Sequence, residues 1–377
     1  MGFIFRLAVV YAGVFGAIGV QLPFLPVWFA AKGLDESTIG ALLAFATLMR
    51  VSVVPFGTRI ADRFGRPREA ILLTTGCCAL ALTALGAASG APALFALYAL
   101  AAAAGATALP LIESYGLRGL AERGLAYGPV RLWGSAAFIA GTLATGVLLT
   151  WMAPVNIIWV LVAIYGCAAI AALRLMPLAP PATGAQRPSA IGLLRDRTLL
   201  AVIAGSALIQ GSHGLLYGFA SLQWSAAGLS GLSISLLWSL GVVAEIVLFA
   251  ISARFPPAFG PLALMAVGAF GATLRWIAMA FDPGLFWLPA LQCLHALSFG
   301  ATHLGAVQLV ARLAPPGLSA TAQGLLAAGN GVAMAAAMAM AGLLNARFGA
   351  VSYAAMALIA IAGGLMLLAA RREGGRI

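Results

Sequence analysis

Residues 57–68 read GTRIADRFGRPR and lie between two apolar runs, at residues 38–57 and 69–88. Each run is long enough to cross a bilayer, which takes about 20 apolar residues. The segment between them carries four Arg and one Asp. A short basic segment between two such runs is typical of a cytoplasmic loop, so this stretch predicts a protein that crosses a membrane more than once.

The order of residues inside this loop predicts a tight turn. Asp62 stands at the end of the preceding run and is followed by Arg63, Gly65 and Arg66. We interpret it as a latch, in which the carboxylate and the guanidinium groups hold neighbouring helices together on the inner side. A plain basic loop is the alternative interpretation.

The pattern of apolar runs continues along the whole chain. Of the 377 residues, 63% are hydrophobic and 8% are charged, whereas a soluble domain has about 25% charged residues. This composition excludes a soluble globular domain, a disordered chain and a disulfide scaffold. The runs are too long, and alternate too little, for the strands of a membrane barrel. We predict an all-α membrane protein with twelve transmembrane helices, at residues 4–30, 38–57, 69–88, 92–114, 128–150, 155–174, 199–222, 232–252, 261–281, 285–310, 318–343 and 350–370.

The basic residues predict the orientation of these helices. Sixteen of the 21 Lys and Arg fall in loops on the side of the N-terminus, and two, Lys32 and Arg347, fall on the other side. By the positive-inside rule both termini are cytoplasmic, and we place the chain in a bacterial inner membrane. The net charge of +11 therefore reflects topology, and we expect no nucleic-acid partner.

One polar stretch divides the chain into two halves. Residues 175–198 hold four Pro and three Arg and are expected to form a cytoplasmic linker. Residues 1–174 then form an N-terminal six-helix half, and residues 199–377 form a C-terminal one.

Polar and charged residues inside the predicted spans are the candidate functional residues. A charge at mid-membrane costs about 2.5–3.5 kcal/mol, so these groups are expected to be paired or to line a cavity. They are Arg50, Glu113, Arg131, Glu245, Arg275, His213, His295 and His303. The alternatives are a structural ion pair for Glu245 and Arg275, a surface position for Glu113 and Arg131, and a satisfied structural hydrogen-bond donor for each His.

Glu245 is the sharpest of these candidates. Trp238 and Phe249 share its helical face. Burial favours the protonated form of a carboxyl and a neighbouring Arg favours the ionised form, which together suit a proton carrier. Arg275 could be that neighbour, since Gly268 and Gly271 on its face leave room for another helix.

The remaining candidates suit contact with a substrate. Arg131 lies near Trp133 and Phe138, and a guanidinium beside aromatic rings can bind a carboxylate or a ring-bearing ligand. Glu113 lies across the same loop. His213 shares its face with Gln210 and Tyr217, which makes His213 and Tyr217 further candidates.

Two more features limit the function. An ideal α-helix places His303 about 80° round from His295, so we expect a smaller role for His303 and a structural one for Arg50. The four Cys lie in spans without C-x-x-C spacing, and we expect no metal site and no cofactor beyond a proton gradient. No Ser/His/Asp set or phosphate loop is present in the sequence, so we expect a protein that is not an enzyme.

Several short motifs resemble those of one known family. They are LPFLPVW (22–28), YGPVRLWGS (127–135), QGSHGLLYGF (210–219), LWSLGVVAE (237–245), LRWIAM (274–279) and LQCLH (291–295). Together with DRFGR (62–66), they are similar to the major facilitator superfamily, in its 3-phenylpropionate-permease-like branch, and more distantly to the oligosaccharide:proton symporters. In the loop signature of the superfamily, Thr58 stands where a Gly belongs, and Gly57 is one residue early.

This resemblance implies roles for particular residues. By it, Glu113 and Arg131 bind substrate and Phe138 stacks on it, while Glu245, Arg275 and His295 match the acid, Arg and His of helices 8, 9 and 10. Two positions depart from the lactose-permease pattern: Ser298 stands where a proton-carrying acid is expected, and His213 replaces an acid of helix 7. The role of proton carrier then falls to Glu245, with His295 next.

We therefore expect a proton-coupled symporter that works by alternating access and takes up a small, aromatic carboxylic acid. Trp238 and Tyr217 complete the expected substrate site. The expected partners are the substrate, the proton and membrane lipid, and the protein is expected to act as a monomer. A sugar or nucleoside symporter, a proton-antiport exporter of amphipathic compounds, and a scaffold or sensor that does not transport are the alternatives.

Overall fold

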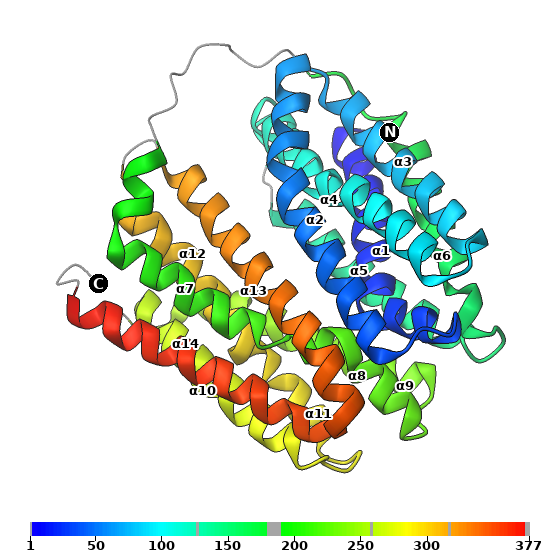
Figure 1. Ribbon diagram of the computed structural model, residues 1–377. Helices are drawn as coiled ribbons and strands as arrows, with labels where there is room; N and C mark the ends of the chain where they lie inside the picture. Colours follow the sequence, from blue (N-terminus) through cyan, green and yellow to red (C-terminus); the bar gives the residue numbers. More distant parts are fainter. Residues whose placement is uncertain (1, 126–127, 179–189, 257–258, 316–317, 374–377) are drawn as a thin grey trace. The chain divides into compact units, whose positions relative to one another are not determined.

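The computed structural model describes residues 2–125, 128–178, 190–256, 259–315 and 318–373. For residues 62, 64, 128–129, 131, 190–191, 253 and 371–373 it describes the backbone only. All regular structure in these residues is helical, as Figure 1 shows. The prediction of an all-α fold is confirmed for this part of the chain.

The helices follow the predicted spans in order along the chain. Those before residue 179 are α1 (Phe3–Ala31), α2 (Glu36–Phe64), α3 (Pro67–Ala87), α4 (Ala91–Ala121), α5 (Gly128–Leu148), η1 (Pro154–Asn156) and α6 (Ile157–Ala172). Those after residue 189 are η2 (Ala190–Arg195), α7 (Arg197–Gly211), α8 (Gly214–Ala226), α9 (Gly231–Ile251), η3 (Ser252–Arg254), α10 (Pro261–Ala280), α11 (Leu288–Cys293), η4 (Ala296–Ala301), α12 (Thr302–Leu313), α13 (Ser319–Phe348), η5 (Gly349–Ser352) and α14 (Tyr353–Glu373).

Ten stretches of the described chain are long and apolar enough to cross a membrane, and Leu132–Leu148 is a shorter apolar helix. The number of twelve spans stays a prediction. Several helices continue past their predicted ends; α2 runs to Phe64 and α4 to Ala121. An apolar run marks only the part of a helix inside the hydrocarbon, and the helix continues into the headgroup region, where charged side chains are solvated.

The chain forms two compact units. Unit 1 comprises Met1–Thr183 and Trp224–Leu236, and unit 2 comprises Gly184–Gln223 and Leu237–Ile377. The boundaries that we predict at residues 174 and 199 stay a prediction.

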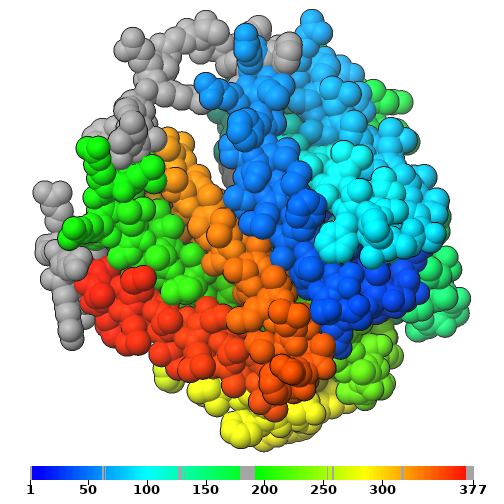
Figure 2. Space-filling view, viewed as in Figure 1, coloured from blue at the N-terminus to red at the C-terminus, as the bar shows by residue number. Residues whose placement is uncertain are grey.

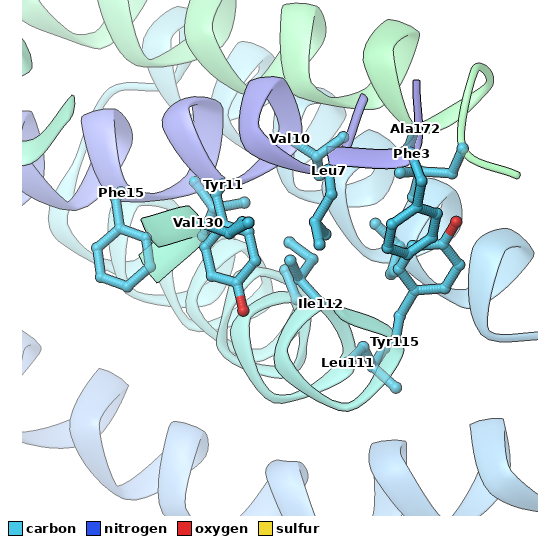
Figure 3. Packing of buried hydrophobic residues seen from close by; sticks show 14 of the residues in the cluster. Phe3, Leu7, Val10, Tyr11, Phe15, Leu111, Ile112, Tyr115, Val130 and Ala172 are labelled. Atoms are coloured by element: carbon cyan, nitrogen blue, oxygen red, sulfur yellow. The ribbon is translucent and has the colours of Figure 1, made fainter. Parts of the chain in front are cut away.

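The core of unit 1 surrounds α1, which packs against α4, α5 and α6. Figure 3 shows side chains of α1 meeting those of α4, with Phe3 beside Tyr115 and Leu7 above Ile112. The ring centroids of Phe3 and Tyr115 are 5.5 Å apart. The Tyr115 hydroxyl also donates to the carbonyl of Met176 at 2.7 Å, which holds the chain after α6 against this core.

The loop at residues 57–68 is shorter than its sequence suggests. Since α2 ends at Phe64 and α3 begins at Pro67, the turn consists of Gly65 and Arg66. Gly65 has φ +62°, a conformation that favours glycine. The Arg63 and Arg66 side chains are exposed, while the Asp62 side chain lies outside the described residues, so the latch stays a prediction.

Gly57, the displaced glycine of the loop signature, has a packing role of its own. A Cβ at this position would lie 2.5 Å from Cγ2 of Thr107. Helices α2 and α4 therefore approach closely at Gly57. Thr58, one residue on, donates its hydroxyl to the carbonyl of Val54 at 2.9 Å inside its own helix.

In unit 2, α7 (green) packs between α13 (orange) and α14 (red), as Figures 1 and 2 show. Helix α10 packs against α12 and α14.

Two predicted spans of this unit are interrupted helices. The span at 199–222 breaks at Ser212 and His213, between α7 and α8, and the span at 285–310 contains the π-helical turn η4. Many large apolar side chains in both units are exposed, among them Leu80 at 72% and Phe270 at 68%, as expected of helices that face lipid.

Candidate functional site

A layer of buried and partly buried polar side chains crosses unit 2. It draws residues from α9, from α10, from the junction of α7 and α8, and from the segment that runs through α11 into η4. These residues are His213, Glu245, Arg275, Gln292, His295 and Ser298. Four of the six are candidates predicted from the sequence.

The break between α7 and α8 positions His213. Gly211 and Gly214 flank it, and a Cβ at Gly214 would lie 2.8 Å from Cβ of Ala337 on α13. The broken helix therefore touches α13. The Ser212 hydroxyl donates to the carbonyl of Ile209 at 2.6 Å and accepts the indole N–H of Trp276 at 2.8 Å, which ties the break to α10.

The π-helical turn η4 positions His295, Ser298 and Phe299. A π turn holds one residue more than an α turn and is common at functional sites. The rings of His295 and Phe299 stack at 5.1 Å, and those of Phe299 and His303 at 5.8 Å. The three rings form a stacked row, from the buried His295 through Phe299 to the exposed His303.

Arg275 is the centre of the polar layer. Its side chain is fully buried, and Gly271 on the same helix brings α10 close to η4, since a Cβ there would lie 2.7 Å from Cβ of Leu297. Nη2 donates to Oε1 of Gln292 at 2.6 Å. Nη1 lies 3.2 Å from Nδ1 of His295 and donates to Ser298 Oγ at 3.4 Å.

All three of these acceptors are uncharged groups. Among the acidic side chains that the structure describes, Glu245 lies beside this cluster, with its Oε2 3.7 Å from Nε2 of His295. A buried cation without a carboxylate at contact distance is costly to maintain. The cost suggests that the charge itself is used.

The donor rules of the side chains fix the tautomer of His295. A guanidinium has donors only. Nδ1 of His295 must therefore accept from Arg275, and the proton of the neutral ring stands on Nε2. Nε2 lies 3.7 Å from Oε2 of Glu245. A second ring proton would have to stand on Nδ1, against the guanidinium.

The same rules fix His213. Its Nδ1 faces the carbonyl oxygens of Ile209 and Gln210, at 3.2 and 3.1 Å, so it carries the proton and donates. Its Nε2 then accepts the Ser298 hydroxyl at 3.1 Å, and Ser298 Oγ can accept from Arg275. Both histidines are neutral in this arrangement.

Glu245 lies at the accessible end of the layer. Its side chain is 20% exposed, whereas Arg275 and His213 are fully buried. A Cβ at Gly300 would lie 3.4 Å from Cγ of Glu245, so the glycine lets α9 approach η4. The layer therefore runs, from its interior outward, from Arg275 through His295 to Glu245.

The predicted aromatic residues stand beside this end. The ring of Tyr217 lies 6.4 Å from that of His295 and 5.9 Å from that of Trp238. The indole N–H of Trp238 donates to the Ser221 hydroxyl at 2.9 Å. His213, predicted as a substrate contact, has no exposed surface here and reaches the layer through Ser298.

The other predicted substrate contacts belong to unit 1. Glu113 lies on α4 and is partly buried, and Phe138 lies on α5 and is 8% exposed. Helix α5 holds to α1 beside Phe138, where the Thr142 hydroxyl donates to the carbonyl of Gly19 at 2.7 Å. The Arg131 side chain lies outside the described residues. Substrate contact stays a prediction for all three.

Sequence reasoning missed Gln292, which holds Arg275, and Ser212, which holds the helix break. A buried amide in an apolar span was the available signal for Gln292. No comparable signal marked Ser212, since Ser is common in membrane helices.

Comparison with known proteins adds to this geometry. The model of the MFS_1 like family matches residues 4–360. The chain is 30% identical over 310 residues to a protein of Escherichia coli (strain K12) named "Probable 3-phenylpropionic acid transporter", with 81% of each chain covered. It is 29% identical over 373 residues to the maltose permease of Geobacillus stearothermophilus, covering 96% of this chain and 93% of that one.

Solved structures agree with the fold. The nucleoside transporter NupG superposes with a TM-score of 0.87 at 17% identity, over 99% of this chain and 100% of that chain. An auto-inhibited peptide transporter of the POT family superposes with a TM-score of 0.77 at 13% identity, over 100% of this chain and 97% of that chain. At these identities the likeness concerns the fold alone.

Proposed function

This chain belongs to the MFS_1 like family, and from that premise we propose that it is a proton-coupled symporter of a small aromatic carboxylic acid. The coarser part of this statement is established: the chain is a multi-pass membrane transporter and not an enzyme. The proposal adds twelve spans, alternating access, uptake as the direction, a bacterial inner membrane with both termini in the cytoplasm, and a monomer.

The observation that carries the proposal is the charge of Arg275. The guanidinium is buried among Gln292, His295 and Ser298, which are all neutral acceptors. Glu245 is the acid that lies beyond His295 in the layer. The positive charge is therefore balanced at a distance, through a neutral ring, by a group that can take up a proton.

The balance couples the proton to an anion. With Glu245 ionised, Arg275 and Glu245 sum to zero, and an anionic substrate gains little by entering. With Glu245 protonated, the pair carries one positive charge, and a carboxylate is attracted to it. Proton and carboxylate then cross together without net charge, and loss of the proton on the other side releases the anion.

Glu245 is the proton carrier in this scheme, and His295 is the group between it and Arg275. His295 is poorly suited to carry the proton itself, because its Nδ1 already accepts from Arg275. A second proton would set two positive charges against each other. The Glu245 side chain is 20% exposed and that of His295 11%, so Glu245 is the more accessible of the two groups to a proton.

The aromatic nature of the substrate rests on two supports. The ring of Tyr217 lies near those of His295 and Trp238, and offset or edge-on ring pairs with a substrate would each contribute about 0.5–1.5 kcal/mol. The likeness to the Escherichia coli protein supports the same class. On the resemblance set out above, Glu113, Arg131 and Phe138 supply the other substrate contacts.

Sugar symport is the second candidate. The likeness to the maltose permease extends over nearly the whole chain and favours it. A neutral sugar would leave the charge of Arg275 unmatched whenever Glu245 is protonated. We therefore rank it below the acid.

The test is proton movement on addition of substrate. The protein is reconstituted in liposomes that hold a pH dye, and 3-phenylpropionate, a hydroxylated analogue, lactose and a nucleoside are added in turn. Weak acids cross lipid unaided, so protein-free liposomes are subtracted. We expect protein-dependent acidification with the aromatic acids alone. A response to lactose or the nucleoside alone would keep the symporter and reject the acid.

Glu245→Gln separates coupling from binding. We expect this variant to lose proton-driven uptake and to keep exchange of labelled for unlabelled substrate, because exchange needs no net movement of protons. Glu122→Gln, the same change at the exposed end of α4, is the matched control and should behave as the unaltered protein. Proton-driven uptake that persists in Glu245→Gln would remove Glu245 as the carrier.

A further inference from the structure

The shortest hydrogen bond of the buried guanidinium goes to an amide. Nη2 of Arg275 donates to Oε1 of Gln292 at 2.6 Å, and Gln292 is 2% exposed. Since the guanidinium cannot accept, the amide oxygen must face it. The amide nitrogen of Gln292 and Nε of Arg275 have no hydrogen-bond partner. The contact between Gln292 and Arg275 therefore leaves one buried polar atom of each side chain without a hydrogen bond.

A glutamate would fill the same volume and form a stronger contact. Buried guanidinium groups are commonly satisfied by carboxylates, which can accept two parallel N–H bonds and also carry the opposite charge. A carboxylate at residue 292 would cancel the positive charge of Arg275 in place. Glutamine gives the guanidinium the same point of attachment and leaves its charge intact.

We propose that Gln292 determines the charge class of the substrate, because it positions Arg275 with a neutral acceptor and so leaves one positive charge for an anion. The inference rests on the proposed function and deepens it. Gln292 is a positioning residue, which acts through Arg275 and does not itself contact substrate. The expected class is a monovalent carboxylate in preference to an uncharged compound of the same shape.

The competing explanation is packing alone, with Gln292 filling space between α10 and α11. The two explanations differ in what an isosteric change does. If Gln292 only fills space, then Gln292→Glu and Gln292→Met disturb acid and neutral ligands alike. If Gln292 sets the charge of the site, then Gln292→Glu selectively weakens binding of the acid ligand, because a carboxylate beside the guanidinium stays ionised and cancels its charge.

The experiment measures binding by purified full-length protein in detergent, by calorimetry. The ligands are 3-phenylpropionate and its uncharged amide, and the readout is the ratio of their dissociation constants. In Gln292→Glu we expect the dissociation constant of the acid to rise about tenfold or more, from the added negative charge, and that of the amide to change less than about threefold. Gln292→Met should shift both by a similar factor, since it removes the acceptor without adding charge.

Thermal unfolding without ligand gives an independent check. Removing the acceptor of a buried charge destabilises, so Gln292→Met should unfold at a lower temperature than the unaltered protein. If Gln292→Glu does not fold, Ser298→Asp places a carboxylate at another neutral acceptor of the same guanidinium and should lower the preference for the acid in the same way.

The outcomes separate the two proposals. If the unaltered protein binds neither ligand, the proposed function fails. If it binds the acid and Gln292→Glu leaves the ratio of acid to amide unchanged, the proposed function stands and the inference about Gln292 is overturned.

Discussion

Replacing His295 by Asn and by Gln tests the hydrogen-bond directions of the polar layer. The Asn amide oxygen can stand where Nδ1 stands and accept from Arg275, but Asn has nothing at the position of Nε2. The Gln amide nitrogen can stand near Nε2 and face Glu245, but it offers Arg275 no acceptor at Nδ1. Each variant therefore keeps one of the two contacts, and neither can carry a proton in the working range of pH.

The two contacts differ in strength. The bond from Arg275 to Nδ1 spans 3.2 Å and involves a charged donor; such bonds contribute about 1.5–3 kcal/mol. The Nε2 to Oε2 separation is 3.7 Å, beyond hydrogen-bond distance, and such a contact is worth at most about 1 kcal/mol. We therefore expect uptake to fall by about 10- to 150-fold in His295→Gln and by less than about tenfold in His295→Asn.

The assay is the initial rate of uptake of labelled 3-phenylpropionate into liposomes, driven by a proton gradient, with exchange measured in parallel. His303→Asn is the matched control, since it makes the same change at an exposed ring of the same interrupted span. If His295→Asn loses gradient-driven uptake but keeps exchange, then His295 carries the proton and the tautomer argument is wrong.

Two further predictions concern stability, each measured by thermal unfolding in detergent. Gly57→Ala should lower the free energy of unfolding by about 1–3 kcal/mol, because the added methyl group forces α2 away from Thr107. Gly76→Ala is the control: a Cβ there meets no atom within 4 Å, so the change should be neutral or stabilising. Equal effects of the two changes would contradict the close approach of α2 and α4 at Gly57. The hydroxyl of Ser37 and the amide and hydroxyl of Thr38 donate to Asp35 and lower the pKa of its carboxyl from 3.8 to about 2. The ionised carboxylate therefore stabilises the folded protein fully above about pH 4, and this contribution is lost as the pH falls toward about 2. Asp35→Asn should remove this part of the acid-side loss, and parallel stability curves for the two proteins would show that Asp35 contributes none.

The helical architecture was predictable because lipid leaves few alternatives. A membrane span must satisfy its own backbone, so a long apolar run is a helix whatever its neighbours are. The charged residues inside those runs were predictable as candidates for the same reason. Glu245, Arg275 and His295 come from three separate runs, and the structure brings them into one layer.

The interruptions were not predictable from apolar periodicity. Hydropathy runs through the break at Ser212 and His213 in the run at 199–222, because these two residues are stabilised by Trp276 and Ser298 from other helices. The end of α2 at Phe64 could not be placed by hydropathy either, because hydropathy reports the hydrocarbon boundary and not the last residue of the helix.

The hydrogen-bond directions needed distances. The sequence places a Gln, a His and a Ser at 292, 295 and 298 but does not say which atoms of these side chains face Arg275. The π turn also changes the spacing of the segment, so counting residues from His295 could not place the side chains that follow it. Gln292 was passed over because it carries no charge, which is the property on which its proposed role depends.

The π turn η4 also affects how this chain is aligned with others. A chain with one residue fewer within Ala296–Ala301 would form an ordinary α-helix there, and the residues on either side would keep the same faces, because the wider π turn absorbs the extra residue. Two proteins can then match on both sides of this turn only if their alignment opens a gap of one residue inside it. Evolutionary comparison across this segment therefore has to pair residues by their position in space.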